Sequence, residues 1–294
     1  MDTPPICNYE GSAYQEEFWD QGGRAYEDTA EAVALKDLLP SHGSLLLELG
    51  AGAGRNTRRY EGYEKIILLD YSRSQLEQAR QNLGDDSRYK FVAADIYRLP
   101  FVDGLFDGAT MIRTLHHMAE ARQALFQVRR VLKKNACFIL EFANKLNIKA
   151  ILRWVLHRQY WNPFSPEPVE FVALNYDFHP ATVRAWLKQT DFILERQLSV
   201  SHFRIGFIKK VVPLNLLVIL ESLFQKTGDL WQLTPSVFIK SRAAGDSIAA
   251  AQPDTFFRCP ACGANLVDHP SLITCPKCGQ RYPVENGIYD FRLS

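Results

Sequence analysis

Apolar segments of strand length alternate with helical patterns through the first half of this chain, and this alternation limits the possible folds more than any other feature. The apolar runs cover residues 44–49, 65–70, 89–94, 106–112 and 136–142. Helical patterns lie between them at 55–61, 74–83 and 119–132. Strands that alternate with helices form parallel sheets through right-handed crossovers. The sequence therefore predicts an α/β fold, a doubly wound parallel sheet with helices on both faces.

The rest of the chain is less regular. We predict helices at 15–39, 146–157, 179–190 and 211–224, and strands at 192–200 and 236–241. Residues 243–254 are small, polar and rich in breakers, which is typical of a linker. The predicted organisation is thus one large domain over 1–242, a linker over 243–254 and a small unit over 255–294.

Composition narrows the class of protein. The net charge is +1, so no overall positive field attracts nucleic acid, although a local basic patch stays possible. The N-terminal residues lack the basic and apolar regions of a signal peptide. The longest apolar run, 211–224, is interrupted by Pro213 and is too short to span a bilayer. These features predict a soluble, cytoplasmic protein.

A glycine-rich turn follows the first predicted strand, with Gly50, Gly52 and Gly54 directly after Glu48-Leu49. Glycine lets the backbone turn tightly and approach a ligand closely. Dinucleotide enzymes use such turns too, but they favour a small residue where this chain has Arg55. The Glu48 carboxylate would also repel a pyrophosphate. It suits S-adenosylmethionine (SAM), which carries an ammonium and a sulfonium group.

Acidic residues also close the next two predicted strands. Asp70 ends the second strand, where a carboxylate can accept both ribose hydroxyls of an adenosine ligand. Asp95 follows the third strand and can accept from an adenine amino group, with Ile96 packed on the ring. Each acid alone could be a loop or capping residue. Their occurrence at consecutive strand ends favours a ligand site.

At these motifs the chain resembles the class I SAM-dependent methyltransferases, and most of all the subgroup with quinone-biosynthesis and small-molecule enzymes. The matching segments are ELGAGAGR, LLDYS, VAADIYRLPF, FDGATMIRTLHHM and RRVLKKNACFILEF. The resemblance implies a Rossmann-like sheet of seven strands, with the last strand antiparallel. Asn135-Ala136 replaces the family's usual glycine pair, which changes a turn. The implied cofactor contacts are Glu48, Gly50, Ala51, Gly52, Asp70, Tyr71, Asp95, Ile96 and Arg113, joined by Arg24 and Tyr26 of the N-terminal helix.

Candidates for catalysis follow the fourth predicted strand. His116 or His117 could deprotonate or orient an acceptor. In the family, histidine at the His117 position accompanies varied chemistries, which favours a structural or cofactor-shaping role. The Asn-Pro-Pro-Tyr motif of enzymes that methylate adenine or glutamine amino groups is not matched by IRTLHHM. His179 is a further acceptor-site candidate, with a helix start as the alternative.

A basic amphipathic segment follows the fifth strand. Basic residues from Lys145 to Arg158 alternate with Ile148, Leu152 and Trp154. Such a segment could face an anionic lipid, RNA or an acidic partner, or it could be a plain surface helix.

Four of the six cysteines form two Cys-X-X-Cys pairs near the end of the chain, namely Cys259, Cys262, Cys275 and Cys278. Each pair can supply half of a tetrahedral thiolate site, and a glycine after each pair allows the tight turn. Disulfides are the weaker alternative for a chain without a secretion signal. We predict a closed, structural zinc site, because four thiolates leave no open position for substrate.

Residues 259–291 resemble the tRNA-methyltransferase activator subunit family, a zinc-ribbon-like group whose Tyr-Pro-hydrophobic and Gly-Ile pattern recurs at 282–288. Members of that family bind and stabilise methyltransferases that act on tRNA, rRNA or release factor. The resemblance implies that the tethered ribbon docks on its own catalytic domain. A flexible module that recruits an outside partner is the alternative.

Three functions remain open at this point. The first is methylation of a small or lipid-like acceptor, favoured by the subgroup and by the apolar 211–224 segment. The second is methylation of RNA or protein, suggested by the ribbon and the basic segment. The third is a SAM-binding scaffold without activity, which the complete glycine turn and acids disfavour. The sequence does not identify the acceptor or the oligomeric state.

Overall fold

The computed structural model describes residues 4–11, 23–245 and 255–293. A single sheet of ten strands runs through the molecule in the order β12-β13-β14-β3-β2-β1-β4-β5-β9-β8. Its seven-stranded part comprises β1 (Gly43–Leu49), β2 (Tyr63–Asp70), β3 (Tyr89–Ala93), β4 (Phe106–Met111), β5 (Leu132–Ala143), β8 (Phe192–Val200) and β9 (Ser236–Ala243). Strand β9 is antiparallel to both β5 and β8, whereas the pairs among β1 to β5 are parallel. The predicted Rossmann-like sheet with an antiparallel last strand is confirmed.

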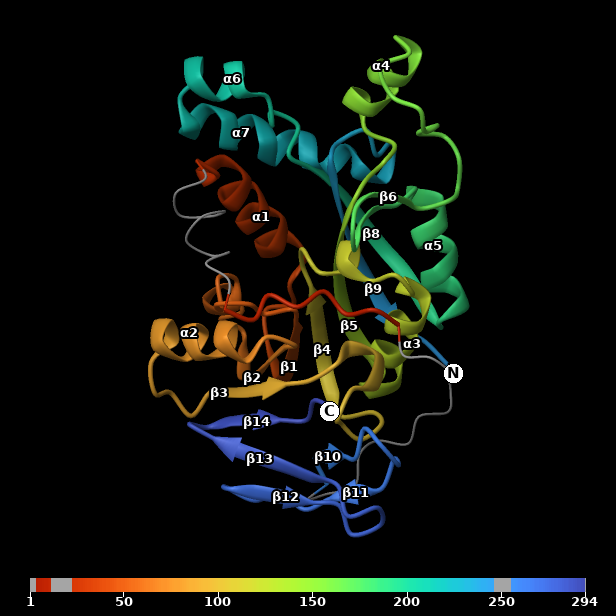
Figure 1. The fold of residues 1–294 in the computed structure, drawn as a ribbon. Helices are drawn as coiled ribbons and strands as arrows, with labels where there is room; N and C mark the ends of the chain where they lie inside the picture. The colour runs from red at the N-terminus through yellow and green to blue at the C-terminus, as the bar shows by residue number, and fades with distance from the viewer. Residues whose placement is uncertain (1–3, 12–22, 246–254, 294) are drawn as a thin grey trace.

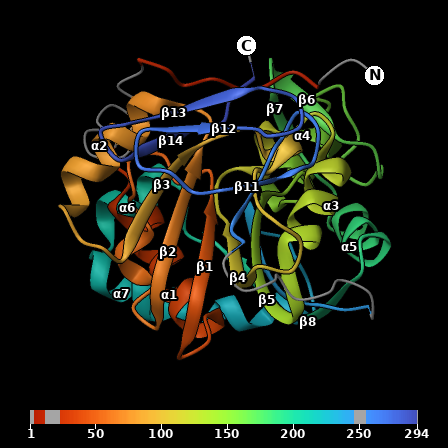
Figure 2. The same cartoon turned by 90° about the horizontal axis from the view of Figure 1, so that it is seen from below.

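Helices cover both faces of this sheet, as its apolar composition requires. Figures 1 and 2 show α1 (Ala25–Leu38) and α2 (Arg73–Leu83) on one face, and α3 (Ala121–Val131) and α5 (Pro180–Gln189) on the other. Two clusters of buried apolar side chains correspond to the two faces. The short 3-10 helices are η2 (Thr57–Arg59), η3 (Ile96–Arg98), η4 (Leu115–His117) and η5 (Gln225–Asp229).

Several predicted elements differ in the structure. The helix expected at 55–61 is reduced to η2, because the glycine turn continues as irregular chain up to it. The helix expected at 211–224 is α7 (Leu214–Phe224), which begins after Pro213, a residue without the N–H that a continuous helix needs. A separate helix, α6 (Gly206–Val211), precedes it and was not predicted. The first helix begins at Ala25, and residues 15–22 of its predicted span lie within the stretch that is not described.

Two other elements lie on the acceptor side of the sheet. Helix α4 (Ile148–Val155) follows β5 within the predicted range. The hairpin of β6 (Val169–Val172) and β7 (Asn175–Asp177) has no counterpart in the sequence prediction. Among the described helices, none combines the length and apolarity needed to cross a membrane.

The C-terminal unit is continuous with the main sheet rather than separate from it. It contains β10 (Phe257–Arg258), β11 (Asn265–Leu266), β12 (Leu272–Thr274), β13 (Arg281–Glu285) and β14 (Ile288–Asp290). Strand β14 pairs in parallel with β3 and so covers what would be an open sheet edge. The first two residues of the predicted linker belong to ordered structure: Ala243 ends β9, and the Ala244 N–H donates to the Asp191 carbonyl. Residues 246–254 of that linker lie outside the described ranges.

Candidate active site

The glycine turn forms the floor of a cavity at the carboxyl ends of β1 to β4. Gly50 has a φ of +67°, and a Cβ placed on it would lie 2.1 Å from the Thr114 Oγ1, so a side chain cannot be accommodated. Gly52 has a φ of +53°, and a Cβ there would meet only the Gln75 side chain, at 3.9 Å. The space above Gly52 is therefore the cavity itself. Ala51, between the two glycines, also lines it.

The two acids predicted at strand ends both line this cavity. Asp70 Oδ2 accepts from the Gly52 N–H at 2.8 Å, and its Oδ1 accepts from the Ser72 N–H at 2.9 Å. Burial raises the pKa of Asp70 above its ordinary value. Asp95 Oδ1 accepts from the Tyr97 N–H at 2.8 Å and so caps η3. Tyr71 and Ile96 lie beside these acids in the cavity wall.

Glu48 lines the same cavity, but its carboxylate is engaged by the protein. Oε2 accepts from the Thr57 hydroxyl at 2.6 Å, and Oε1 accepts from the Tyr60 hydroxyl at 3.3 Å. Burial raises the pKa of Glu48 to about 7. The carboxylate therefore ties the strand end to the segment after the glycine turn.

Arg113 and His117 come from the turn after β4 and reach the cavity. Arg113 has a φ of +58°, and its guanidinium pairs with Glu31 of α1, with Nη2 2.5 Å from Oε1. The His117 Nδ1 lies 3.0 Å from the Leu174 carbonyl oxygen in the β6–β7 turn. A carbonyl only accepts, so Nδ1 carries the proton and Nε2 carries the lone pair.

His116 does not reach the cavity among the described residues, although its ring centroid is 4.0 Å from that of His117. Its Nδ1 is buried without a hydrogen-bond partner in the described part of the chain. Burial lowers the pKa of His116 well below its ordinary value. His179 caps α5, where its Nδ1 accepts from the Ala181 N–H at 3.2 Å, which is the helix-start alternative.

The remaining two predicted cofactor contacts lie elsewhere. Tyr26 is buried beneath α7, donates to Glu221 Oε2 at 2.5 Å and accepts from the Phe203 N–H at 3.0 Å. Arg24 occupies the N-cap position of α1. Neither is among the described residues that line the cavity. The prediction placed them there because it took the N-terminal helix as the cover of the site.

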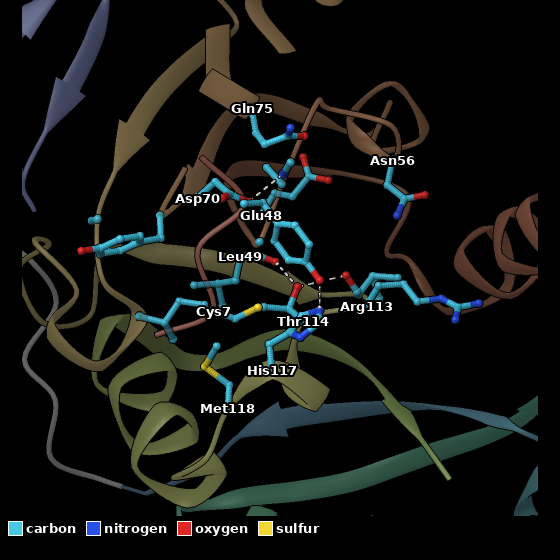
Figure 3. A pocket seen from close by; sticks show the side chains of 18 of the residues that line it. Cys7, Glu48, Leu49, Asn56, Asp70, Gln75, Arg113, Thr114, His117 and Met118 are labelled. Atoms are coloured by element: carbon cyan, nitrogen blue, oxygen red, sulfur yellow. Dashed lines mark hydrogen bonds between the residues drawn. The ribbon is translucent and has the colours of Figure 1, made fainter. Parts of the chain in front are cut away.

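Residues 4–11 provide that cover instead, and sequence reasoning missed them. Ile6, Cys7 and Tyr9 line the cavity, and Figure 3 shows Cys7 beside Met118 and His117. The Tyr9 hydroxyl lies 3.1 Å from His117 Nε2. Glu10 holds the segment in place by accepting from the Arg73 and Ser74 N–H groups at the start of α2, each at 2.9 Å. An irregular segment carries no periodic pattern, so no sequence signal marked it.

The comparisons with known proteins agree with this geometry. Residues 47–140 match the family model described as methyltransferase domain. This part of the chain, about a third of its length, carries a methyltransferase domain. The matched region holds the glycine turn, Asp70, Asp95 and His117.

Individual relatives carry the same kind of domain. The chain is 29% identical over 165 residues to a demethylmenaquinone methyltransferase of Clavibacter sepedonicus, covering 55% of this chain and 64% of that protein. It is 31% identical over 114 residues to the ubiquinone/menaquinone biosynthesis C-methyltransferase UbiE of Stutzerimonas stutzeri, covering 36% and 44%. The aligned parts thus span less than two thirds of either relative's length.

Solved structures show the same fold. One is a complex between the Haloferax volcanii Trm112 methyltransferase activator and a methyltransferase, with a TM-score of 0.57 at 17% identity over 79% of this chain and 97% of that one. A SAM-dependent methyltransferase structure from Listeria monocytogenes matches with a TM-score of 0.54 at 15% identity, over 75% and 99%.

The four cysteines converge at the far end of the molecule from α7. Their sulfur atoms all lie within 4.8 Å of one another, with Cys259 and Cys278 3.7 Å apart and Cys262 and Cys275 3.5 Å apart. Gly263 and Gly279 adopt φ values of +77° and +74° after the two pairs, as the knuckle turns require. None of these cysteines is in a disulfide.

The cysteine unit contacts the methyltransferase domain through backbone pairing at two places. Strand β14 pairs with β3, and the Phe291 N–H donates to the Ala93 carbonyl at 2.8 Å. Phe101 and Phe257 form an antiparallel bridge, and their rings stack with centroids 6.0 Å apart. Arg292 reaches further, to Glu10 at 3.1 Å, so the tail of the unit contacts the segment that covers the cavity.

Proposed function

We propose that the protein transfers the methyl group of SAM to a small or lipid-like acceptor, with a structural zinc in the C-terminal ribbon. One observation supports this most: Asp70 and Asp95, from consecutive strand ends, enter one cavity beside a glycine turn that only glycine can form. A cavity with carboxylates suits a cofactor that carries positive charge and an adenosine.

The residues present fit SAM. The remaining lone pairs of the Asp70 oxygens can accept from ribose hydroxyls, and the open space above Gly52 allows close approach to the backbone. Ile96 and Met118 offer apolar surface for the adenine ring. Bound SAM supplies an activated methyl group, so the protein's task is to position the acceptor and, where needed, to take a proton.

We assign the proton acceptor to His117 rather than His116. The Leu174 carbonyl holds the proton on Nδ1, which leaves the Nε2 lone pair directed at the Tyr9 hydroxyl. Burial lowers the pKa of His117, so the ring is neutral and able to accept a proton near neutral pH. Tyr9 belongs to the segment that covers the cavity, and its hydroxyl orients the His117 imidazole, so Tyr9 is a positioning residue.

A change of Tyr9→Phe tests this arrangement, because it keeps the ring, which packs edge-on with centroids 5.4 Å from His117, and removes only the hydroxyl. We expect a lower kcat and a shifted lower limb of the pH profile, with SAM affinity unchanged. His117→Ala should lose more, about 100-fold or greater, as general bases contribute that much. Wild-type pH profiles in both variants would refute the assignment.

The zinc proposal rests on the sulfur arrangement. Zn–S bonds of about 2.3 Å in a tetrahedron require sulfurs about 3.8 Å apart. Two of the sulfur pairs are 3.5 and 3.7 Å apart, and each Cys-X-X-Cys pair is followed by a glycine. Four thiolates would complete the shell, so the metal's role would be to hold the ribbon folded.

We further propose that the ribbon stabilises the methyltransferase domain. In the Haloferax volcanii complex an activator and a methyltransferase are associated. Here the ribbon is part of the same chain, which raises its effective concentration. The ribbon would stabilise the domain through the pairing of β14 with β3 and through the contact between Phe101 and Phe257.

The acceptor class is supported by the relatives named for demethylmenaquinone and ubiquinone/menaquinone methylation. The resemblance of the ribbon to the tRNA-methyltransferase activator subunit family favours the second candidate, an acceptor among RNA or proteins. The deciding experiment incubates the full chain with methyl-labelled SAM and a cell extract, then separates lipid, small-molecule, RNA and protein fractions. We expect label in the lipid or small-molecule fraction. Label in RNA or protein would favour the second candidate over our proposal. No label above that of an extract without the protein would refute methyl transfer.

A further inference from the structure

Large apolar side chains are exposed on the helices at the end of the molecule opposite the ribbon (Figure 1). On α4 they recur every three or four residues, at Ile148, Leu152 and Val155, so they lie on one face of the helix. The face is exposed rather than buried against the sheet. An amphipathic helix whose apolar side faces water is the reverse of the usual arrangement.

Helices α6 and α7 show the same pattern. Phe207 and Val211 are exposed one turn apart on α6, and Leu216, Ile219 and Leu223 form an exposed row on α7. Single exposed apolar residues are ordinary, but contiguous rows of this kind mark a contact surface.

These rows lie at one end of the molecule, which we call the apolar basic face and define as α4, α6, α7 and residues 230–233. The Ile148 N–H donates to the Leu233 carbonyl at 2.9 Å, so the stretch that contains the exposed Leu230 and Trp231 leads to the start of α4. Lys149 Nζ contacts the Arg204 carbonyl just before α6. All three helices lie at the same end of the molecule, with α4 standing apart from α6 and α7 (Figure 1).

The charges of the apolar basic face have a single sign. Residues 148–158 contain no acid, and 205–226 contain only Glu221, which is buried. The exposed cations on these stretches are Lys149, Arg153, Arg158, Lys210 and Lys226. Apolar rows flanked by lysine and arginine are what an anionic bilayer surface attracts.

We propose that the apolar basic face binds the surface of an anionic lipid membrane. The longest of its helices, α7, has 11 residues, about half of what a spanning helix needs, so the helices lie on the bilayer. A second copy fits less well, because an isologous contact would set the same cations against each other. The stretches that define the face carry no exposed acid, and the exposed Asp229 beside them already accepts from the Gln197 N–H at 2.7 Å.

The position of this face relates it to the cavity. Strands β5 and β8 are both antiparallel to β9, so their carboxyl ends share the edge on which the cavity opens. Helix α4 follows β5, and α6 follows β8. A membrane under these helices would therefore lie along the acceptor side of the domain. The proposal concerns lipid binding alone and stands or falls independently of methyl transfer.

Vesicle flotation of the purified full chain tests it, without SAM. We expect binding to phosphatidylcholine vesicles that contain phosphatidylglycerol, and much weaker binding to phosphatidylcholine alone or in high salt. The apolar test is Phe207→Ser with Ile219→Ser, side chains that are 75% and 58% exposed. The matched control is Phe126→Ser with Ile193→Ser, 60% and 47% exposed on other faces. The first pair should weaken binding about 100-fold, and the control should not.

To test the charges, we combine Arg153→Glu with Lys210→Glu. The control combines Arg122→Glu with Lys188→Glu, two exposed positions on α3 and α5. Each cation near an anionic surface contributes about fivefold, so the test pair should lose at least 25-fold and the control little. Equal loss in test and control pairs, or no flotation with anionic vesicles, would overturn the proposal. So would sedimentation showing a dimer that Phe207→Ser with Ile219→Ser dissociates.

Discussion

Replacing Phe257 by alanine tests whether the ribbon supports the methyltransferase domain. Phe257 is fully buried, with ring centroids of Phe256 and Phe291 each 4.8 Å away, Tyr289 5.1 Å away and Phe101 of the methyltransferase domain 6.0 Å away. Removing such a buried ring costs about 3–5 kcal/mol, from lost transfer energy and the cavity left behind. We expect the free energy of unfolding to fall by about this amount.

Tryptophan fluorescence during unfolding in urea measures this effect on the methyltransferase domain. All five tryptophans precede residue 232, so their signal reports only on the methyltransferase domain. Val267→Ala, at an exposed ribbon position, is the control and should change stability by less than about 0.5 kcal/mol. An unchanged tryptophan transition in Phe257→Ala would show that the ribbon's packing does not stabilise the domain, and would refute the reasoning.

Three further predictions concern the cofactor, the metal and pH. Asp70→Ala should weaken SAM binding by at least about 10-fold, because each charge-assisted hydrogen bond contributes about 1.5–3 kcal/mol; calorimetry with unchanged affinity would contradict the assignment. Cys275→Ser should release the one zinc per chain expected by metal analysis and unfold the ribbon; wild-type protein purified without chelator but free of zinc would overturn the site. Glu48 has a folded-state pKa of about 7 against an ordinary 4.5, so its contribution to stability is present below pH 4.5 and is lost as pH rises through 7. In Glu48→Gln this fall should vanish, and a wild-type slope of unfolding free energy between pH 4.5 and 7 would rule out the assignment.

Glu48 illustrates where inference from the sequence reached its limit. The sequence shows that Glu48 precedes the glycine turn. Its hydrogen-bond partners, Thr57 and Tyr60, depend on the path of the backbone after the turn, which the sequence does not show. For Tyr26, the sequence predicted the helix but not the direction of the side chain. Packing against α7, almost two hundred residues later, turns Tyr26 toward Glu221 and away from the cavity.

The sequence by itself determined the parallel sheet, the glycine turn with Asp70 and Asp95, and the paired cysteines, because local spacing and residue type carry those features. Only the tertiary structure decided which element covers the cavity and where the ribbon lies. Tyr9 meets His117, and β14 meets β3, across more than a hundred residues of sequence. Such contacts arise because a sheet edge and an open cavity must be covered, and nothing local in the sequence states which segment covers them.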